Sequence, residues 1–261
     1  MLSFENKFPP LNLAELEWEL QALVHYRREY ELRLEQYLKG PGGFKGGDTQ
    51  LAAESGEAIL AVLKSQPQAA KPNEARDVAA NVKSLWDKPL KVTPVIFAMP
   101  EMGQAQRVGD LVDSSKRVGF DLAGNHVTRQ WPWVKDGTAL LVWDPGHTGV
   151  IKDGRQLFGS RTWWIFFRDG YEALSVLDDN HDGVLTGWEL DGLVVWVDEN
   201  RNGVCDDGEI KTLGTLNIKA LRYSHAPVEG HPDHIVYSPQ GVLYNDGTSG
   251  PSYDIILHQK P

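Results

Sequence analysis

The amino-acid sequence predicts an α+β protein in which an N-terminal helical segment precedes a strand-rich domain. Three observations carry this prediction. Apolar residues recur at helical spacing early in the 261-residue chain, short β-branched and aromatic runs separated by Gly, Asp and Asn fill the rest, and seven of the nine tryptophans lie at or beyond Trp131. We place the helical segment at residues 1–86 and the strand-rich domain at residues 87–261.

The first predicted helix begins near Asn12, which forms a capping pair with Glu15, and it ends at Gly40 and Pro41. Its apolar residues alternate spacings of three and four, with Arg27 interrupting the pattern, at Leu13, Leu16, Leu20, Leu23, Tyr30, Leu34 and Tyr37. We expect this helix to pack on its own domain. Self-association, or binding of a protein partner through this helix, is the alternative.

Two weaker helices are predicted at residues 51–64 and 73–86, separated by a Gln/Pro/Ala stretch. A short helix at residues 170–177 follows Asp169, which is placed to form a capping pair with Glu172. The predicted strands occupy residues 92–97, 119–122, 139–143, 163–167, 193–197 and 218–223. For the aromatic run 163–167 we expect a buried strand, with a carbohydrate or partner site as the alternative.

Charge and hydropathy restrict the classes of function. The chain has 26 Lys and Arg against 36 Asp and Glu, for a net charge of -10, which disfavours nucleic-acid binding. The sequence contains no run of about 18 to 20 apolar residues that could span a bilayer, and residues 1–10 lack the pattern of a signal peptide. A single cysteine, Cys205, excludes an intrachain disulfide and a thiolate-based metal cluster.

Residues 178–189 match the twelve-residue EF-hand calcium loop, D-x-[DN]-x-[DN]-G-x5-E, at every required position. Calcium takes about six to eight oxygen ligands, and alternate residues of a tightly curled loop can supply them. Gly183 allows the positive φ of the turn. The predicted Ca²⁺ ligands are Asp178, Asn180, Asp182, the carbonyl of Val184, Thr186 (directly or through water) and Glu189.

A second match follows at residues 198–209, with Gly203 at the turn. Its predicted Ca²⁺ ligands are Asp198, Asn200, Asn202, the carbonyl of Val204, Asp206 and Glu209. Only residues 190–197 join the two loops, so we expect a helix before the first loop and a strand before the second. Leu185 and Cys205, at the eighth position of each loop, are expected to pack between neighbouring loops, with Cys205 as a buried filler.

A degenerate third segment, residues 144–159, keeps Asp144 and Gly149 but has Lys152 and Arg155 at the ninth and twelfth positions. We interpret it as a structural turn without a strong metal site.

These residues carry a resemblance. The stretch from Trp143 to Gly159, the Asp169–Leu174 segment, the two Asp/Asn loops and Trp196 together resemble bacterial proteins of uncharacterised role that contain EF-hand-like calcium loops. The loops are similar to those of EF-hands and dockerins, and similar strings occur beside hemolysin-type calcium repeats in secreted proteins. The resemblance implies calcium binding and an extracytoplasmic setting.

Two functional hypotheses follow from the sequence. The first is a calcium-binding protein whose loops stabilise a structural or interaction module. The second is a calcium-stabilised enzyme, such as a hydrolase, or a carbohydrate-binding protein, whose active site the sequence leaves unidentified. For a separate metal or acid-base site the candidates are His225, His231, Asp233 and His234, although Pro and Gly around them favour a surface loop. No residue is assigned a catalytic role, and a non-enzymatic protein is favoured.

Overall fold

The computed structural model describes residues 13–39, 48–86, 91–102, 107–165, 167–231 and 235–259. The chain forms two compact units, Met1–Lys88 and Pro89–Pro261, which are described separately. The mixture of helices and antiparallel strands confirms the α+β class.

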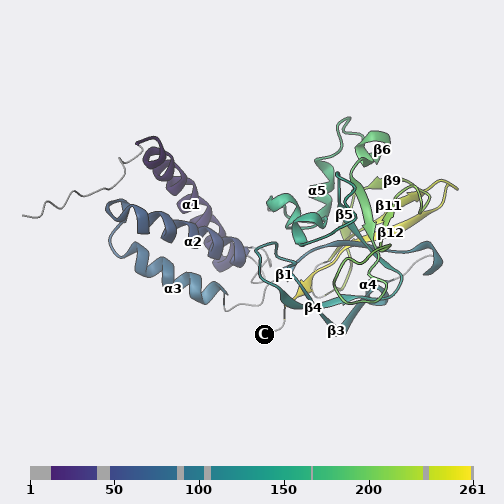
Figure 1. The fold of residues 1–261 in the computed structure, drawn as a ribbon, viewed down its shortest axis with the longest axis horizontal. Coiled ribbons are helices and arrows are strands. Elements are labelled where there is room, and N and C mark those ends of the chain that lie inside the picture. The colour runs from purple at the N-terminus through teal and green to yellow at the C-terminus, as the bar shows by residue number, and fades with distance from the viewer. Residues whose placement is uncertain are drawn as a thin grey trace, which may run out of the picture. The chain divides into compact units, whose positions relative to one another are not determined.

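The first unit consists of three α-helices, as predicted: α1 (Leu13–Lys39), α2 (Asp48–Ser65) and α3 (Glu74–Trp86), with a 3₁₀ turn η1 (Pro67–Ala69) before α3. Helix α2 packs against both α1 and α3 (Figure 1). A Cβ on Gly56 of α2 would lie only 2.4 Å from the Val82 side chain, so glycine permits the close approach of α2 and α3. The buried core of this unit comprises Leu23, Tyr30, Ala52, Ala53, Ile59, Leu63, Val78, Val82 and Leu85.

The predicted apolar seam of α1 is only partly buried. Leu23 and Tyr30 face the core, whereas Leu20 is 37% exposed, because α2 packs along one side of α1 and cannot bury its whole circumference. Val24 and Leu32 are also exposed. The expected cap at Asn12 and the loop at residues 40–47 lie outside the described residues.

The second unit is built on a nine-stranded antiparallel sheet with the order β6-β9-β11-β12-β2-β5-β7-β8, and β10 pairs with β11. Its strands are β2 (Val95–Ala98), β5 (Thr138–Trp143), β6 (Val184–Thr186), β7 (Leu193–Trp196), β8 (Ile210–Thr212), β9 (Ile218–Arg222), β10 (Ala226–Pro227), β11 (Val236–Tyr244) and β12 (Ser249–Asp254). In Figure 1 this sheet curls around its own core.

Two two-stranded sheets complete the second unit. One pairs β1 (Lys91–Val92) with β13 (Leu257–His258), and the other pairs β3 (Val112–Phe120) with β4 (Arg129–Val134). Two short helices, α4 (Val108–Leu111) and α5 (Gly170–Ser175), interrupt the strands. The 3₁₀ turns are η2 (Pro100–Met102), η3 (Gly154–Gln156), η4 (Thr162–Trp164) and η5 (Gly187–Leu190). Tyr171 of α5 is fully buried and its hydroxyl donates to the Ser252 carbonyl at 2.7 Å, which fixes α5 against β12.

Three strand predictions need correction. The predicted strand 119–122 coincides with β3 only at the last two residues of β3, because the strand ends at Phe120. The predicted strand 92–97 is divided into β1 and β2 around Pro94. In the aromatic run 163–167, the described residues 163–165 and 167 are not in a strand, because Trp163 has a left-handed backbone (φ 54°) in turn η4. The Trp163 ring packs edge-on against Trp143, Phe158 and Phe167 at centroid distances of 5.4 to 6.1 Å. This aromatic contact, rather than a β-ladder, holds the segment.

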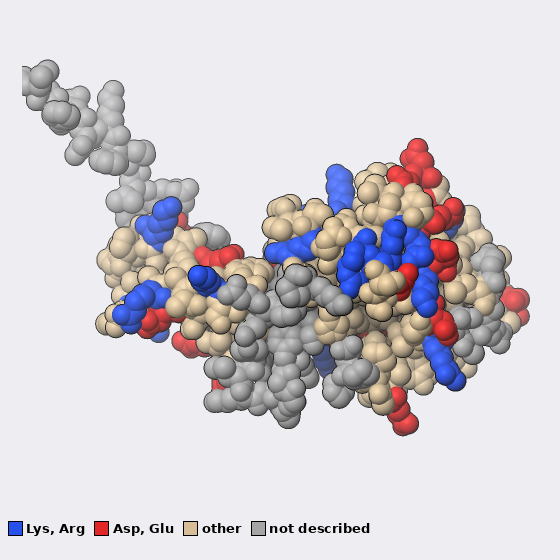
Figure 2. All heavy atoms as spheres, turned by 90° about the horizontal axis from the view of Figure 1, so that it is seen from below, with Lys and Arg blue, Asp and Glu red and all other residues tan. Residues whose placement is uncertain are grey.

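The surface carries both signs of charge. On the face drawn in Figure 2, Lys and Arg side chains gather on the strand-rich unit, with Asp and Glu side chains beside them. Within the described parts of the chain, none of the helices has the length and apolar character needed to cross a bilayer.

Candidate functional site

The first predicted calcium loop, residues 178–189 (the Asp178 loop), lies between α5 and β7 and contains β6. The helix before it and the strand after it were both predicted. Three residues of the loop have left-handed backbones: His181 (φ 59°) at the fourth position, Gly183 (φ 86°) at the sixth and Gly187 (φ 54°) at the tenth. The loop is therefore tightly curled between two rigid elements.

Asp178 is the first residue of this loop and is 1% exposed. Its Oδ2 accepts hydrogen bonds from the Gly183 N–H at 2.9 Å and from the Tyr223 hydroxyl at 2.6 Å. Its Oδ1 is buried and has no hydrogen-bond partner among the described residues. The hydrogen bond from Tyr223 lowers the pKa of Asp178 and, in return, raises the pKa of Tyr223 to about 12. Asp178 is thus a buried, ionised carboxylate with one oxygen that lacks a donor.

Glu189, at the twelfth position, folds back over the beginning of the loop and is 4% exposed. Its Oε1 accepts from the Asp179 N–H at 3.1 Å, and its Oε2 accepts from the Thr186 N–H at 2.9 Å. This carboxylate therefore joins the two ends of the loop.

The remaining polar residues of the Asp178 loop form successive Asx turns. The Asn180 side-chain oxygen accepts from the Asp182 N–H, and Asp182 accepts from the Val184 N–H, each at 2.8 Å. Asn180, Asp182 and Thr186 are exposed, whereas Asp178 and Glu189 are buried.

The second predicted loop, residues 198–209 (the Asp198 loop), connects β7 to β8. Asp198 is buried, and its Oδ2 accepts from the Gly203 N–H at 2.8 Å and from the Trp133 indole N–H at 2.6 Å. Glu209 is also buried and accepts from the Trp196 indole N–H at 3.1 Å. Two buried tryptophans therefore hold the first and last carboxylates of this loop.

These two tryptophans belong to an aromatic cluster with Phe120. The ring centroids of Phe120, Trp133 and Trp196 lie 5.6 to 5.8 Å apart, and both indoles are fully buried. The indole donors are consequently fixed by packing. Sequence reasoning did not identify Trp133 or Trp196 as part of the loop environment, because neither lies within the loop motif.

The middle of the Asp198 loop is closed by side-chain amides. The Asn200 and Asn202 amide groups donate to Asp206 Oδ2 at 2.7 and 2.9 Å, and these hydrogen bonds lower the pKa of Asp206. Arg201, at the fourth position, pairs with Asp113 of β3 and so joins the loop to the β3–β4 hairpin.

Across the described residues, no group of three or more His, Cys, Asp or Glu side chains lies together as a metal-binding set. The structure brings the first and twelfth carboxylates of each loop to the loop backbone. The side chains at the third, fifth and ninth positions instead contact backbone N–H groups or one another, or are exposed.

The degenerate segment, residues 144–159, has the same turn but lacks acidic residues at the ninth and twelfth positions. Asp144 is buried and accepts from the Thr148 N–H at 3.0 Å and the Gly149 N–H at 2.8 Å. Although burial opposes it, these hydrogen bonds lower the pKa of Asp144. The side-chain oxygen of Gln156 accepts from the Lys152 N–H at 2.8 Å, as the loop glutamates do from their ninth positions. A neutral amide one residue later thus replaces the twelfth-position carboxylate.

A fourth loop of the same geometry begins at Asp121 and was missed from the sequence. Asp121 accepts from the Asn125 N–H at 3.1 Å and from the His126 N–H at 2.7 Å, at the fifth and sixth positions. His126 has the left-handed backbone (φ 63°) that glycine has in the other loops. The signal in the sequence was weak, because Ala123 and His126 replace the usual oxygen ligand and the turn glycine.

The eighth-position residues of the two predicted calcium loops contact different partners: Leu185 lies against a strand, whereas Cys205 contacts a neighbouring loop, as expected. Leu185 is buried and pairs with Leu221 of β9. Cys205 is half-buried, and its thiol donates to the Gly149 carbonyl of the degenerate segment at 3.4 Å. Burial raises the pKa of Cys205, as befits a packing residue.

Of the four C-terminal candidates, His225 and His231 lie among the described residues, where no group of metal-binding side chains is found. The His225 ring stacks on Tyr171 with centroids 4.8 Å apart, and its Nε2 lies 3.7 Å from Asp169 Oδ2. Asp233 and His234 lie outside the described residues. The expected capping role of Asp169 is confirmed, because its side chain accepts from the Glu172 N–H at 2.8 Å.

Comparison with known proteins places these loops in a family. A family model, the SPM domain, matches residues 109–258, which include all four loops and exclude α1, α2 and α3. The chain is also 30% identical over 145 residues to the iron-regulated protein FrpA of Neisseria meningitidis serogroup C. That match covers 53% of this chain and 13% of FrpA. Since the family model matches more than half of the chain, the protein belongs to the SPM domain family.

Proposed function

We propose that the strand-rich unit is a calcium-binding module in which the Asp178 and Asp198 loops each hold one Ca²⁺ that stabilises the fold. The observation that carries the proposal is the Oδ1 atom of Asp178. It is a buried carboxylate oxygen with no hydrogen-bond partner among the described residues, at the first position of a complete calcium-loop motif.

The other three loops support this interpretation by contrast. In the Asp121, Asp144 and Asp198 loops, the Oδ1 atom of the first aspartate accepts a hydrogen bond from the N–H of the fifth residue. In the Asp178 loop the N–H of the fifth residue, Asp182, donates to Asn180 instead. An oxygen without a donor is better satisfied by a cation than by an apolar neighbour.

Each loop offers a donor set suited to a hard divalent cation. In the first loop the ligands would be Asp178, Asn180, Asp182, the Val184 carbonyl, Thr186 and Glu189. In the second they would be Asp198, Asn200, Asn202, the Val204 carbonyl, Asp206 and Glu209. Both sets contain three carboxylates, whose mutual repulsion an ion would relieve.

Binding requires a local rearrangement of side chains. The Asn200 and Asn202 amides now donate to Asp206, so their carbonyl oxygens would have to turn toward the ion. The buried ends of both loops need not move far, because backbone N–H groups hold them together with Tyr223 in the Asp178 loop and with Trp133 and Trp196 in the Asp198 loop. Calcium would therefore order the exposed middle of a loop whose ends are already fixed.

A stabilising role fits this fold better than a sensor role. A calcium sensor needs helices that reorient around the ion, but the only helix that flanks either loop in the described chain is α5, of six residues. Its Tyr171 is locked to β12 through Ser252. Binding that favours the folded state would instead add about 2.7 kcal/mol of stability per site at a hundredfold excess over Kd.

The test is a calorimetric calcium titration of the metal-stripped full chain. The unmodified protein should bind two ions. The paired variants Asp178→Asn with Glu189→Gln, and Asp198→Asn with Glu209→Gln, should each bind one. Asp144→Asn, which changes a buried aspartate in the degenerate segment, is the matched control and should still bind two.

Two results would contradict the proposal. One is an unmodified protein that binds no calcium while its circular dichroism shows it to be folded. The other is a stoichiometry of two that survives in both paired variants.

A further inference from the structure

The Asp198 loop rests on the β3–β4 hairpin, which forms a two-stranded sheet of its own. A Cβ on Gly203 would lie 2.9 Å from the Val118 side chain of β3, so the sixth position of the loop packs directly on this strand. The Trp133 indole of β4 donates to the carboxylate of Asp198 at the first position. The hairpin therefore holds the loop at two of its twelve positions.

Arg201, at the fourth position, makes a third contact between the loop and the hairpin. Its Nη2 donates to Asp113 Oδ2 of β3, and its Nε lies 3.6 Å from Asp136 Oδ1. The side chains of Arg201 and Asp113 are only 22% and 25% exposed. Solvent therefore screens this pair less than it screens an ion pair between two mobile surface side chains.

Asp113 is a rigid partner for Arg201. Its other oxygen, Oδ1, accepts from the Ser115 N–H at 2.9 Å, from the Ser115 hydroxyl at 2.6 Å and from the Lys116 N–H at 3.1 Å. These hydrogen bonds close an irregular stretch of β3, where the register with β4 shifts between Asp113 and Arg117. The carboxylate is thus oriented by β3 itself and presents Oδ2 to the loop.

The fourth position has a left-handed backbone in all four loops. The angle φ is 69° at Gly124, 49° at His147, 59° at His181 and 58° at Arg201. Glycine adopts this conformation without a steric cost, whereas a larger residue keeps it only where the surrounding structure compensates. At Arg201, the contact with Asp113 supplies such compensation.

Two predicted calcium ligands, Asn200 and Asn202, are the chain neighbours of Arg201. The Asn202 N–H donates to Asn200 Oδ1 at 3.0 Å and to Asp198 Oδ1 at 3.1 Å. Both hydrogen bonds span Arg201, so they depend on its backbone conformation. A change of φ at this residue would move the two amide side chains apart from the buried first aspartate.

We propose that Arg201 is a positioning residue for the calcium site of the Asp198 loop, because its contact with Asp113 holds the left-handed backbone between two predicted ligands. The inference rests on the proposed calcium function and adds a determinant of affinity on β3, outside both loop motifs. In the Asp178 loop the fourth residue is His181, which is exposed. We therefore expect the dependence on β3 at the Asp198 loop only.

The experiment is a calorimetric calcium titration of the metal-stripped full chain. All variants are made in the background Asp178→Asn with Glu189→Gln, in which one ion should bind, at the Asp198 loop. There, Arg201→Gln and Asp113→Asn should each weaken calcium binding about three- to tenfold. The two changes together should weaken it no more than either alone, because both break the same contact.

Arg201→Gly separates the backbone from the charge. It removes the same charge and the same contact as Arg201→Gln, but glycine adopts a positive φ freely. Arg201→Gly should therefore bind calcium within about twofold of the background, and Asp113→Asn should have no further effect in it.

Hydrogen exchange of the Asn202 amide, measured by NMR in chelator, reads the same geometry without the metal. This amide should exchange faster in Arg201→Gln than in the background, because its two hydrogen bonds within the loop weaken. In Arg201→Gly its exchange should stay close to that of the background.

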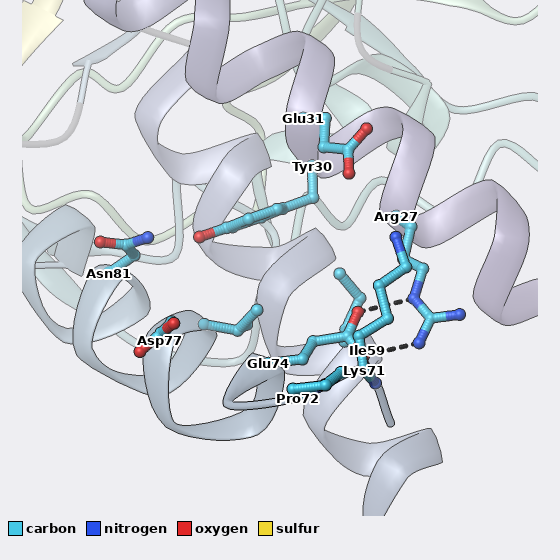
Figure 3. A pocket seen from close by; sticks show the side chains of 10 residues that line it. Arg27, Tyr30, Glu31, Ile59, Lys71, Pro72, Glu74, Asp77 and Asn81 are labelled. Atoms are coloured by element: carbon cyan, nitrogen blue, oxygen red, sulfur yellow. Dashed lines mark hydrogen bonds and ion pairs between the residues drawn. The ribbon is translucent and has the colours of Figure 1, made fainter. Parts of the chain in front are cut away.

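Glu74→Gln is the matched control. It breaks another contact between an arginine and a carboxylate, since Arg27 of α1 donates through Nε and Nη2 to the two carboxylate oxygens of Glu74 of α3, both at 2.6 Å. The two side chains line a pocket of about 270 Å³ in the helical unit (Figure 3). That unit has its own core, so calcium affinity should stay unchanged.

Three results would overturn the inference alone, with one ion still bound in the background. They are unchanged affinity in Arg201→Gln, equal losses in Arg201→Gln and Arg201→Gly, and losses in Arg201→Gln and Asp113→Asn that add. A folded unmodified protein that binds no calcium would overturn the proposed function, and this inference with it.

Discussion

One aspartate at the first position holds the turn in each of the four loops. Asp121, Asp144, Asp178 and Asp198 all accept a hydrogen bond through Oδ2 from the N–H of the sixth residue, at 2.7 to 2.9 Å. All four are buried, and a buried carboxylate needs such donors. The first aspartate therefore shapes the turn in all four loops, including the Asp121 and Asp144 loops, which lack the full set of predicted metal ligands.

At the same scale, Trp133→Phe tests the indole that donates to Asp198. We expect the free energy of unfolding in chelator to fall by about 2–4 kcal/mol, because a buried carboxylate loses a donor and the ring becomes smaller. We also expect calcium affinity at the Asp198 loop to fall about tenfold, because the donor orients a ligand. Urea unfolding and calorimetry measure the two effects.

Trp131→Phe is the matched control for this substitution. Trp131 lies on the same strand and is equally buried, but its indole donates to the neutral carbonyl of Phe120 at 3.0 Å. It should lose stability and keep its calcium affinity. Parallel losses of affinity in both variants would mean that Trp133 acts only through packing.

At the scale of elements, local periodicity predicted what local interactions determine. The three helices, α5, β5, β7 and β9 were all predicted, because apolar spacing and capping residues such as Asp169 act within a few residues. Strands β4, β11 and β12 were missed, because Pro132, Pro239 and Pro251 interrupt their patterns. They are strands because partners distant in sequence pair with them, as β2 does with β12.

The candidate site likewise combines features that are local in sequence with features that depend on distant elements. The twelve predicted ligand positions rest on the spacing within two local motifs, and their metal binding stays a prediction. The donors from Tyr223, Trp133 and Trp196 could not be found from spacing, because they depend on the sheet and on the packing of β4 and β7. The run at Trp163 was misjudged, since a single left-handed residue converts an apolar run from strand to turn.

The contact between α1 and α3 gives the helical unit a dependence on pH. The hydrogen bond from Arg27 lowers the pKa of Glu74 from its ordinary value of 4.5. A carboxyl group whose pKa is lower in the folded state stabilises the fold above its unfolded pKa and loses this contribution as the pH falls. We expect the helical unit to become less stable as the pH is lowered through about 5 to 3, and Glu74→Gln to flatten this dependence.

Urea unfolding followed by circular dichroism at a series of pH values measures this dependence. Glu29→Gln, which removes a partly exposed i,i+4 pair with Arg33, is the control and should keep the slope of the unmodified protein. An unchanged slope in Glu74→Gln would show that the Arg27–Glu74 pair contributes nothing to acid sensitivity.

At the scale of the whole molecule, the two units have separate cores, and the predicted calcium loops belong to the second only. If calcium stabilises the fold by binding these loops, its effect must be confined to the strand-rich unit. Calorimetric unfolding of the full chain should then give one transition that calcium raises and one that it leaves unchanged. At a hundredfold excess over Kd, the raised transition should shift by about 5–10 °C per site.

The assignment of each transition comes from variants that act on one unit at a time. Asp178→Asn with Glu189→Gln should reduce the calcium shift of one transition and leave the other in place. Glu74→Gln should lower the calcium-insensitive transition, because it removes the contact between α1 and α3. If calcium moved both transitions equally, the units would unfold together and the stabilisation could not be assigned to the loops. If calcium moved neither, the loops would be turns held by hydrogen bonds alone.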